Sequence, residues 1–244
     1  MVTRKRWQDA QTYERSYWAN VAERIASGSA GQLDWYSWKA AQMRKRLVSA
    51  LNRDLTAQSK ILEVGSGPIG IVSFLEYGQR YTIDPLEEYY GLNPALSALR
   101  RSGVVYGSGS GERLPFGDGF FSHVILDNVL DHVQDATGVL DEVHRVLEPE
   151  GIFYLAVNVH VPWGALLHRV LSKMRIDRGH PYTFTKVSIR RFREDHGFRV
   201  KQEFVNDYQK AKEQDLASQL LKDRLKGYSG LSEFVYHAVC LKHP

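Results

Sequence analysis

Cysteine is almost absent from this chain of 244 residues, which contains only Cys240. A single thiol excludes an internal disulfide and a zinc cluster built from cysteines, and it makes a reducing compartment the default expectation. No run of 18 apolar residues is present, and the basic segment Arg4–Arg6 leads into Trp7, Gln8 and Asp9 rather than into an apolar signal region. These absences predict a soluble, cytoplasmic protein without a transmembrane segment.

A large excess of one charge is also missing, because 32 lysines and arginines stand against 28 acidic residues, for a net charge of +4. This balance lacks the dense basic stripe of a dedicated nucleic-acid-binding protein, so we expect no nucleic-acid partner, although an acidic or phosphorylated substrate is permitted. The chain shows no internal repeat. Its length suffices for one α/β domain with additions and is short for two full domains.

The segment Lys60–Gly70 combines a short apolar strand with a glycine-rich turn. Gly65 and Gly67 allow the backbone to turn sharply and to approach a ligand closely, because they carry no side chain. The apolar residues after the turn, through Leu75, are expected to form a helix. A strand, a tight loop and a helix N-terminus in this order can bind a nucleotide.

Two acidic residues narrow the choice of nucleotide. Asp84 follows Gly65 by 84 − 65 = 19 residues, where an acid can bind ribose hydroxyls, but this spacing also fits a nicotinamide cofactor. Glu63 lies inside an apolar strand, where a carboxylate is costly unless a cation or hydrogen-bond donors meet it. A ligand with an ammonium group would meet it, whereas a pyrophosphate would be repelled. The residues therefore predict a nucleoside-like, cationic ligand, unless they are only turn glycines and a solvated Asp84 in an ordinary α/β protein.

The run from Glu63 to Gly67, followed by Ile83 and Asp84, resembles the nucleotide loop of the class I S-adenosylmethionine-dependent methyltransferases. The resemblance covers about residues 58–205 together with the last strand. It implies an α/β fold with a doubly wound, mostly parallel seven-stranded sheet, an antiparallel last strand and a Rossmann-like arrangement. It also implies S-adenosyl-L-methionine as the cofactor, with Glu63 at its methionine end and Asp84 at its ribose.

Two further segments complete the predicted cofactor site. The turn Gly109–Phe116 resembles the adenine-binding loop of the same family, but Ser110 replaces its acidic residue, so that contact could come from Glu112 or from the backbone. Asp127 and Asn128 follow a buried strand and should face the cofactor, because ligands bind at the carboxyl ends of parallel strands. The cofactor-binding residues that we predict are Glu63, Gly65, Ser66, Gly67, Asp84, Pro85, Gly111, Glu112, Arg113, Asp127 and Asn128.

Residues 1–57 precede this core and are rich in tryptophan and tyrosine. Apolar residues at helical spacing predict two helices, with a break at Gly28–Gly31. Aromatic residues at such spacing commonly belong to a hydrophobic core. The resemblance implies in addition that these helices lie over the open end of the sheet, where Tyr13, Trp18 or Trp35 could close on the cofactor or substrate. We predict that they form a helical lid.

The methyltransferase domain is predicted to occupy residues 58–244, with cap insertions at about 160–182 and 208–230. The first insertion alternates an apolar stripe with basic residues, His168, Arg169, Lys173, Arg175 and Arg178. We expect a helix that caps the site with its apolar side inward; a helix on a membrane surface is the alternative. The basic residues near the substrate mouth make an anionic substrate plausible. The second insertion is predicted to be a second cap or a dimer contact.

Methyl transfer requires mainly alignment of the acceptor with the activated methyl group. A hydroxyl acceptor also gains from a base within reach, and the catalytic candidates are His160, His180 and His132, in that order. Asp131 and His132 should face the space beside the cofactor. An interpretation of equal weight is that His132 starts a helix and forms hydrogen bonds to the backbone, without a catalytic role. The sequence indicates no metal site.

The predicted function is methyl transfer to a small molecule, preferably to a hydroxyl group of a sugar or of a glycosylated or lipid-linked metabolite. The absence of an Asn/Asp-Pro-Pro-aromatic run argues against adenine in DNA, and the lone Cys240 argues against cytosine C5 chemistry. A nicotinamide-dependent reductase stays open but leaves Glu63 unexplained. A non-catalytic cofactor-binding partner protein is consistent with Ser110 and the extra helices. We expect a monomer or a homodimer, with peripheral membrane contact as an option.

Overall fold

Seven strands form one sheet at the centre of the structure, in the order β3-β2-β1-β4-β5-β7-β6. The structure is a computed structural model that describes residues 1–29, 33–174 and 179–243; Gly31, Arg175 and Arg178, named above, lie outside these ranges. The strands are β1 (Lys60–Val64), β2 (Gln79–Asp84), β3 (Val104–Ser108), β4 (Phe121–Asp127), β5 (Leu147–Val159), β6 (Phe198–Val205) and β7 (Phe234–Lys242).

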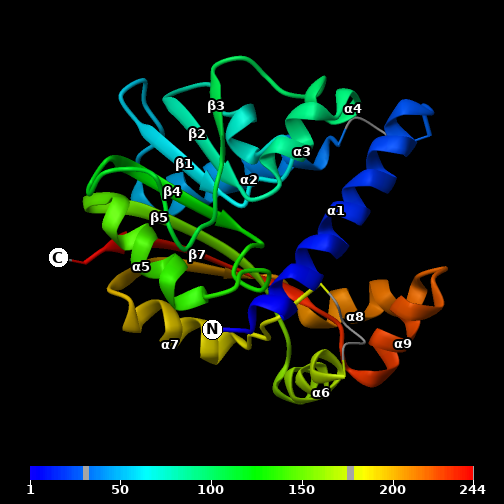
Figure 1. The fold of residues 1–244 in the computed structure, drawn as a ribbon. Coiled ribbons are helices and arrows are strands. Elements are labelled where there is room, and N and C mark those ends of the chain that lie inside the picture. Colours follow the sequence, from blue (N-terminus) through cyan, green and yellow to red (C-terminus); the bar gives the residue numbers. More distant parts are fainter. Residues whose placement is uncertain (30–32, 175–178, 244) are drawn as a thin grey trace.

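The pairing of the strands confirms the predicted fold class. Strands β1 to β5 pair in parallel, whereas β7 pairs antiparallel with both β5 and β6. Helices cover both faces of the sheet (Figure 1). They are α1 (Arg4–Ala26), α2 (Trp35–Leu51), the 3-10 helix η1 (Ile71–Phe74), α3 (Glu87–Leu92), α4 (Pro94–Ser97), α5 (Ala136–Val146), α6 (Pro162–Lys173), α7 (Lys186–Asp195), α8 (Tyr208–Ala217) and α9 (Leu221–Ser229).

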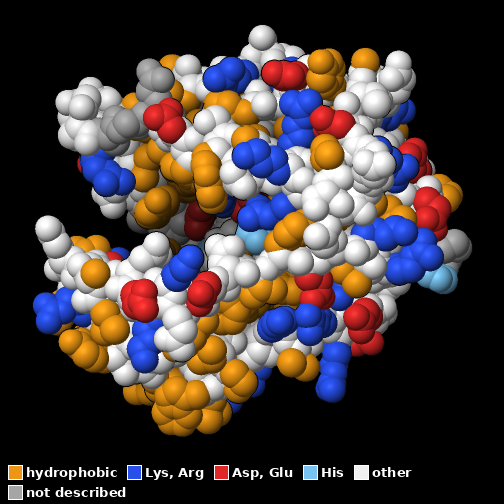
Figure 2. Space-filling model, turned by 180° about the vertical axis from the view of Figure 1, so that it is seen from behind, with side chains coloured by type: hydrophobic (Ala, Val, Ile, Leu, Met, Phe, Trp, Pro, Cys, Tyr) orange, Lys and Arg blue, Asp and Glu red, His pale blue; other side chains and the backbone are white. Residues whose placement is uncertain are grey.

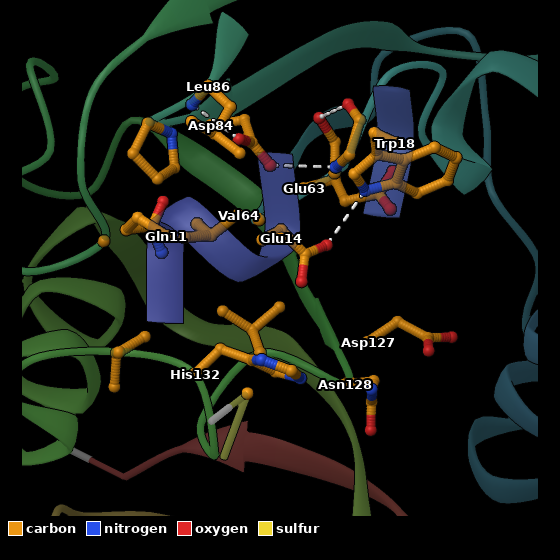
Figure 3. Close-up of a pocket in the computed structure, with 18 of the residues that line it drawn as sticks. Gln11, Glu14, Trp18, Glu63, Val64, Asp84, Leu86, Asp127, Asn128 and His132 are labelled. Atoms are coloured by element: carbon orange, nitrogen blue, oxygen red, sulfur yellow. Dashed lines mark hydrogen bonds between the residues drawn. The ribbon is translucent and has the colours of Figure 1, made fainter. Parts of the chain in front are cut away.

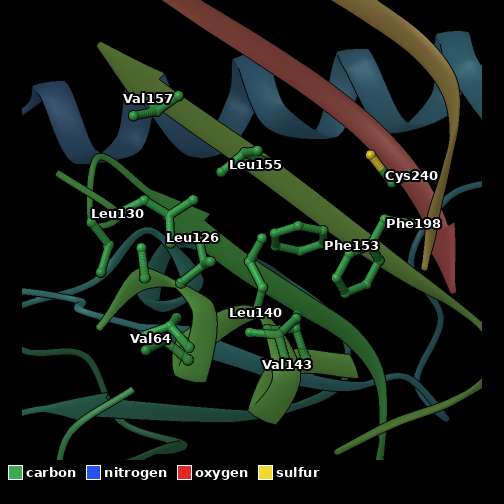
Figure 4. Packing of buried hydrophobic residues seen from close by; sticks show 14 of the residues in the cluster. Val64, Leu126, Leu130, Leu140, Val143, Phe153, Leu155, Val157, Phe198 and Cys240 are labelled. Atoms are coloured by element: carbon green, nitrogen blue, oxygen red, sulfur yellow. The ribbon is translucent and has the colours of Figure 1, made fainter. Parts of the chain in front are cut away.

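The alternation of side chains along the strands divides the core between the two faces. Leu62 and Val64 belong to the cluster that packs against α5 and α7, whereas Ile61, the neighbour of Leu62, belongs to the cluster under α1 and α2. Figure 4 shows the first cluster, to which α5 contributes Val143 and the sheet contributes Leu126 and Phe153. Glu63 takes its place among apolar residues because the sheet is covered on both faces.

The helix predicted after the glycine loop differs from the observed one. The segment forms only the four-residue 3-10 helix η1, because Leu75 is already extended (φ −87°, ψ 139°) on the way back to β2. Between β2 and β3 the chain forms two short helices, α3 and α4, and the side chain of Asn93 caps α4. The insertion predicted at about 208–230 contains two helices, α8 and α9, because Ser218 is extended (φ −63°, ψ 144°).

The apolar stripe of α6 faces outward, which corrects the expectation of an inward apolar side. Trp163, Leu166, Val170 and Met174 are 62%, 55%, 47% and 65% exposed. The buried residues of this helix are small or polar, since Gly164 packs so closely that a Cβ there would lie 2.4 Å from the carbonyl oxygen of Gly230. Across the described residues, none of the helices has the length and apolarity required to cross a bilayer.

Candidate active site

A cavity of about 380 Å³ opens at the carboxyl ends of β1, β2 and β4, beneath α1 and α2. Its wall is strongly acidic. In the described part of the chain, Lys39 is the one lysine or arginine that lines it, against five carboxylates. These are Glu14, Glu63, Asp84, Glu112 and Asp127. The cavity therefore suits a ligand that carries positive charge.

Glu63 reaches the cavity from β1 and is held beneath the glycine loop. Its side chain is 2% exposed, and its Oε2 accepts a hydrogen bond of 3.0 Å from the backbone N–H of Val72. Burial raises the pKa of Glu63 to about 8, although the backbone donors of η1 act in the opposite direction. A Cβ on Gly70 would lie 2.8 Å from this carboxylate, so the loop closes over it only because Gly70 lacks a side chain. A cationic ligand would favour the ionised form of Glu63.

Asp84 joins the end of β2 to the glycine loop. Its Oδ2 accepts from the N–H of Gly67 and its Oδ1 from the N–H of Leu86, both at 2.9 Å. Burial raises its pKa to about 6. Gly65 and Gly67 have φ values of +68° and +61°, a region that favours glycine. The carboxylate thus fixes the loop that follows β1 as well as facing the cavity.

Helices α1 and α2 supply the aromatic wall of the cavity. Tyr13, Trp18 and Trp35, predicted as possible closing residues, all line it. Two charged residues that were not predicted, Glu14 and Lys39, line it as well. Glu14 accepts a hydrogen bond of 2.9 Å from the indole of Trp18, and its spacing of four residues from Trp18 on one helix was an available signal. The Nζ atom of Lys39 lies 2.6 Å from Oδ1 of Asp127. No sequence pattern indicated that Lys39 would line the cavity.

The loop after β3 borders the cavity through Ser110, Gly111 and Glu112. Glu112 uses its Oε1 to accept from the backbone N–H groups of Gln134 and Asp135, at 2.8 and 3.1 Å, where α5 begins. Arg113, predicted to bind the cofactor, is exposed and does not line the cavity. The side chain of Glu112 therefore supports the loop as well as bordering the cavity.

Asp127 and Asn128, at the end of β4, both line the cavity, as do Pro85 and Ser66 of the predicted set. Figure 3 shows Glu63 and Asp84 on one side and Asn128 with His132 on the other. Asn128 has a φ of +62°, and its side-chain Oδ1 is buried without a hydrogen-bond partner among the described residues. A buried oxygen without a partner in the cavity wall indicates that a bound ligand could donate a hydrogen bond to it.

Two of the three candidate histidines line the cavity. They are His132 and His180, whose ring centroids are 4.7 Å apart. His160, the first choice from the sequence, does not line it; its Nε2 is 3.5 Å from Glu233, and its ring stacks on that of His168, which is 6.3 Å from the ring of His180. Burial lowers the pKa of His160 to about 4. The cavity therefore offers two imidazoles to an acceptor, and His160 is not one of them.

Asp131 lies beside these two imidazoles. It is 3% exposed, and its Oδ1 is 3.8 Å from Nε2 of His132. One ligand atom from each of Asp131, His132 and His180 falls within 4.8 Å of the others, so this set could hold a metal ion. The set could not be recognised from sequence spacing, because 48 positions separate His132 from His180 (180 − 132).

Comparison with known proteins agrees with this geometry. Residues 62–155 match the sequence model of a family described as "Methyltransferase domain". An uncharacterized methyltransferase of Schizosaccharomyces pombe is 32% identical over 105 residues, which are 38% of this chain and 37% of the relative. An uncharacterized methyltransferase of a Mycobacterium species is 35% identical over 109 residues, 43% of this chain and 41% of the relative. The matched region spans about two fifths of these relatives.

Solved structures share the fold. A putative methyltransferase from Bacillus halodurans superposes with a TM-score of 0.61 at 18% identity, over 84% of this chain and 100% of its own. A putative sarcosine dimethylglycine methyltransferase from Galdieria sulphuraria gives 0.63 at 15%, over 84% and 85%.

Residues 62–155 of this chain therefore carry a methyltransferase domain. The fold and the acidic cavity around this domain support the class I S-adenosylmethionine-dependent methyltransferases, whose cofactor is S-adenosylmethionine.

Proposed function

We propose that the protein transfers the methyl group of S-adenosylmethionine to a hydroxyl group of a small molecule. The observation that carries the proposal is the charge of the cavity, where five carboxylates face one lysine among the described residues. The cofactor carries an ammonium and a sulfonium, whereas a nicotinamide dinucleotide brings a pyrophosphate that this wall would repel. A reductase is therefore the weaker alternative.

Each part of the wall has a role in this proposal. Glu63, with the backbone at Gly65 and Gly67, would hold the methionine end, and Asp84 would bind the ribose. Asn128 offers an unpaired acceptor in the wall. When bound, the cofactor supplies an activated methyl group on a sulfonium, and the protein contributes alignment and exclusion of water. Helices α1 and α2, which cover the cavity, would act as the lid.

His132 and His180 support a hydroxyl acceptor, because an imidazole in the described cavity wall could assist loss of its proton. The wall gives less support to an anionic substrate, since the ammonium of Lys39 is already paired with Asp127. Neutral hydroxyl compounds, such as a sugar or a glycosylated or lipid-linked metabolite in the cytoplasm, are the first acceptors to test.

The experiment has two stages. Calorimetric titration with S-adenosylhomocysteine and with NADH tests the ligand, and we expect binding of the first alone. Incubation of the protein and an extract with S-adenosylmethionine labelled in its methyl group then tests transfer, with mass spectrometry of the labelled products. Binding without any labelled metabolite would indicate a non-catalytic partner protein and would contradict the proposed activity.

A further inference from the structure

We propose that Asp131, His132 and His180 form a site for one divalent transition-metal ion in the wall of the cavity. One carboxylate and two imidazoles are a ligand set that suits zinc, iron, cobalt or manganese better than calcium or magnesium, which favour oxygen ligands alone. His132 and His180 line the cavity, and Asp131 lies buried beside His132. An ion held there would border the space that is open to an acceptor.

The distances are compatible with a shared ion. Ligand atoms at about 2.1 Å from one tetrahedral ion lie about 3.4 Å from one another. Oδ1 of Asp131 is 3.8 Å from Nε2 of His132, and the three ligand atoms fall within 4.8 Å of one another. Small side-chain rotations would therefore bring all three into coordination distance.

The environment of Asp131 is an independent reason to expect a cation. The residue is 3% exposed, and its Oδ1 has no hydrogen-bond partner in the described parts of the chain. The other buried acids of the cavity differ in this respect, because Glu63 and Asp84 accept hydrogen bonds from backbone N–H groups. A buried carboxylate without such donors is costly unless a cation meets it.

The role of the ion, though not its binding, rests on the proposed function. A hydroxyl group bound to a divalent ion loses its proton more readily. The alkoxide would then attack the methyl carbon, so that the oxygen–carbon bond forms as the carbon–sulfur bond breaks. S-Adenosylhomocysteine leaves as a neutral thioether, and the hydroxyl proton passes to solvent. In this arrangement His132 and His180 act as metal ligands and not as the base.

The site is tested with Co²⁺ as a spectroscopic probe. Untagged protein, dialysed against chelator, is titrated with Co²⁺ while visible absorption is recorded, and Zn²⁺ is used in competition. We expect one equivalent to bind and zinc to displace it. Asp131→Asn and His180→Ala should weaken Co²⁺ binding at least tenfold. The control His144→Ala, which removes an imidazole packed against Phe198 outside the cavity, should leave it unchanged.

Thermal unfolding and S-adenosylhomocysteine binding of each variant show whether it is folded. A folded wild type that binds no Co²⁺ or Zn²⁺, or an equal loss in His144→Ala, would overturn the site. Metal binding without methyl transfer would support the site and count against the proposed function. Methyl transfer that is unaffected by chelator would overturn the role of the ion in the reaction.

We infer, from a separate observation, that α6 and α9 form a surface for an anionic lipid bilayer. We name the following exposed residues the apolar surface: Trp163, Leu166, Val170 and Met174 of the α6 region, with Leu220, Leu221, Leu225 and Tyr228 of the α9 region. The two helices are in contact, since the indole of Trp163 donates to the carbonyl of Ser229 at 3.2 Å. Figure 2 shows hydrophobic side chains gathered at the lower end of the molecule, where Figure 1 places these helices.

The basic residues beside the apolar surface indicate that it binds an anionic membrane. Helix α6 contains no acidic residue, and its exposed Arg169 and Lys173 are matched on α9 by Lys222 and Arg224. Apolar side chains with tryptophan and flanking basic residues are the composition of helices that lie in the headgroup region of anionic membranes. Basic residues give no comparable advantage on a neutral bilayer.

Sedimentation with vesicles tests this surface. We expect the protein to pellet with vesicles that contain phosphatidylglycerol and to remain in solution with pure phosphatidylcholine. The double variant Leu166→Ser/Val170→Ser should lose binding, whereas the control Leu92→Ser, at another exposed leucine, should keep it. Equal sedimentation of all variants would overturn the inference. So would a dimer in light scattering that the double variant dissociates, because the occupant would then be a second copy.

Discussion

The ammonium of Lys39 lies 2.6 Å from Oδ1 of Asp127. Lys39 belongs to α2 and Asp127 ends β4, so this ion pair joins the N-terminal helices to the sheet across the cavity. The side chains are 31% and 10% exposed, which places the pair partly out of water. The two charges of the pair act in opposite directions on the pKa of the nearby Glu63, which Asp127 raises and Lys39 lowers.

Lys39→Met should destabilise the protein by about 1–3 kcal/mol, because it leaves the carboxylate of Asp127 buried without its partner. The double variant Lys39→Met/Asp127→Asn should recover most of this loss, since both charges are then absent. Urea unfolding at pH 7 measures both values. A single variant as stable as the wild type would show that the pair does not hold the helices to the sheet.

Gly67→Ala should weaken S-adenosylhomocysteine binding at least tenfold, because a Cβ there would lie 2.8 Å from Oη of Tyr36 at the cavity wall. The matched control is Gly28→Ala, which has the same left-handed backbone (φ +70°) but open space around the added carbon. Calorimetry should therefore show normal binding by the control, with a small stability loss from backbone strain. Equal binding by both variants would contradict the close packing assigned to the loop.

Arg145→Met should loosen the loop after β3. The guanidinium of Arg145 donates to the carbonyl oxygens of Leu114 and Phe116, and Glu142, its partner, accepts from the N–H of Leu114. We expect faster tryptic cleavage in this loop and weaker cofactor binding. Arg113→Met, at an exposed arginine of the same loop, serves as the binding control. Cofactor affinity that is the same in both variants would show that this anchor is dispensable.

Much of the fold and of the cavity wall could be predicted from the sequence. The apolar runs predicted individual strands, the family resemblance implied the arrangement of the sheet, and the glycines with Glu63 and Asp84 predicted the loop that lines the cavity. Lys39 could not be predicted, since its role depends on how α2 packs over β4. The outward orientation of the apolar face of α6 was not predicted, because periodicity identifies an apolar face but not what that face packs against. The close packing of Gly164 against Gly230 determines which side of the helix is buried. That His160 does not line the cavity could not be predicted either, because a position after a strand does not reveal which way the imidazole turns.

Stability should fall as the pH rises from 6.5 to 8. Burial raises the pKa of Glu63 from 4.5 to about 8, so the folded protein holds a proton that the unfolded chain has released, and ionisation in the folded state is a cost. Asp84 acts in the same direction below about pH 6. Below pH 6.5 the buried His160 and His237 oppose this trend, because their lowered pKa values favour unfolding in acid. Urea unfolding between pH 6.5 and 8 tests whether the free energy of unfolding falls as the pH rises. If that free energy does not change with pH in Glu63→Gln, the dependence in the wild type comes from Glu63.

The most direct test of the account is the affinity of Glu63→Gln for S-adenosylhomocysteine, measured by calorimetry at pH 7.5 beside the wild type. The substitution preserves shape and removes the charge that is assigned to the ligand's ammonium. We predict a loss of about 1–3 kcal/mol, which is roughly five- to 150-fold in affinity, together with loss of the proton release that accompanies binding to the wild type. An affinity within a few tenths of a kcal/mol of the wild type would contradict it.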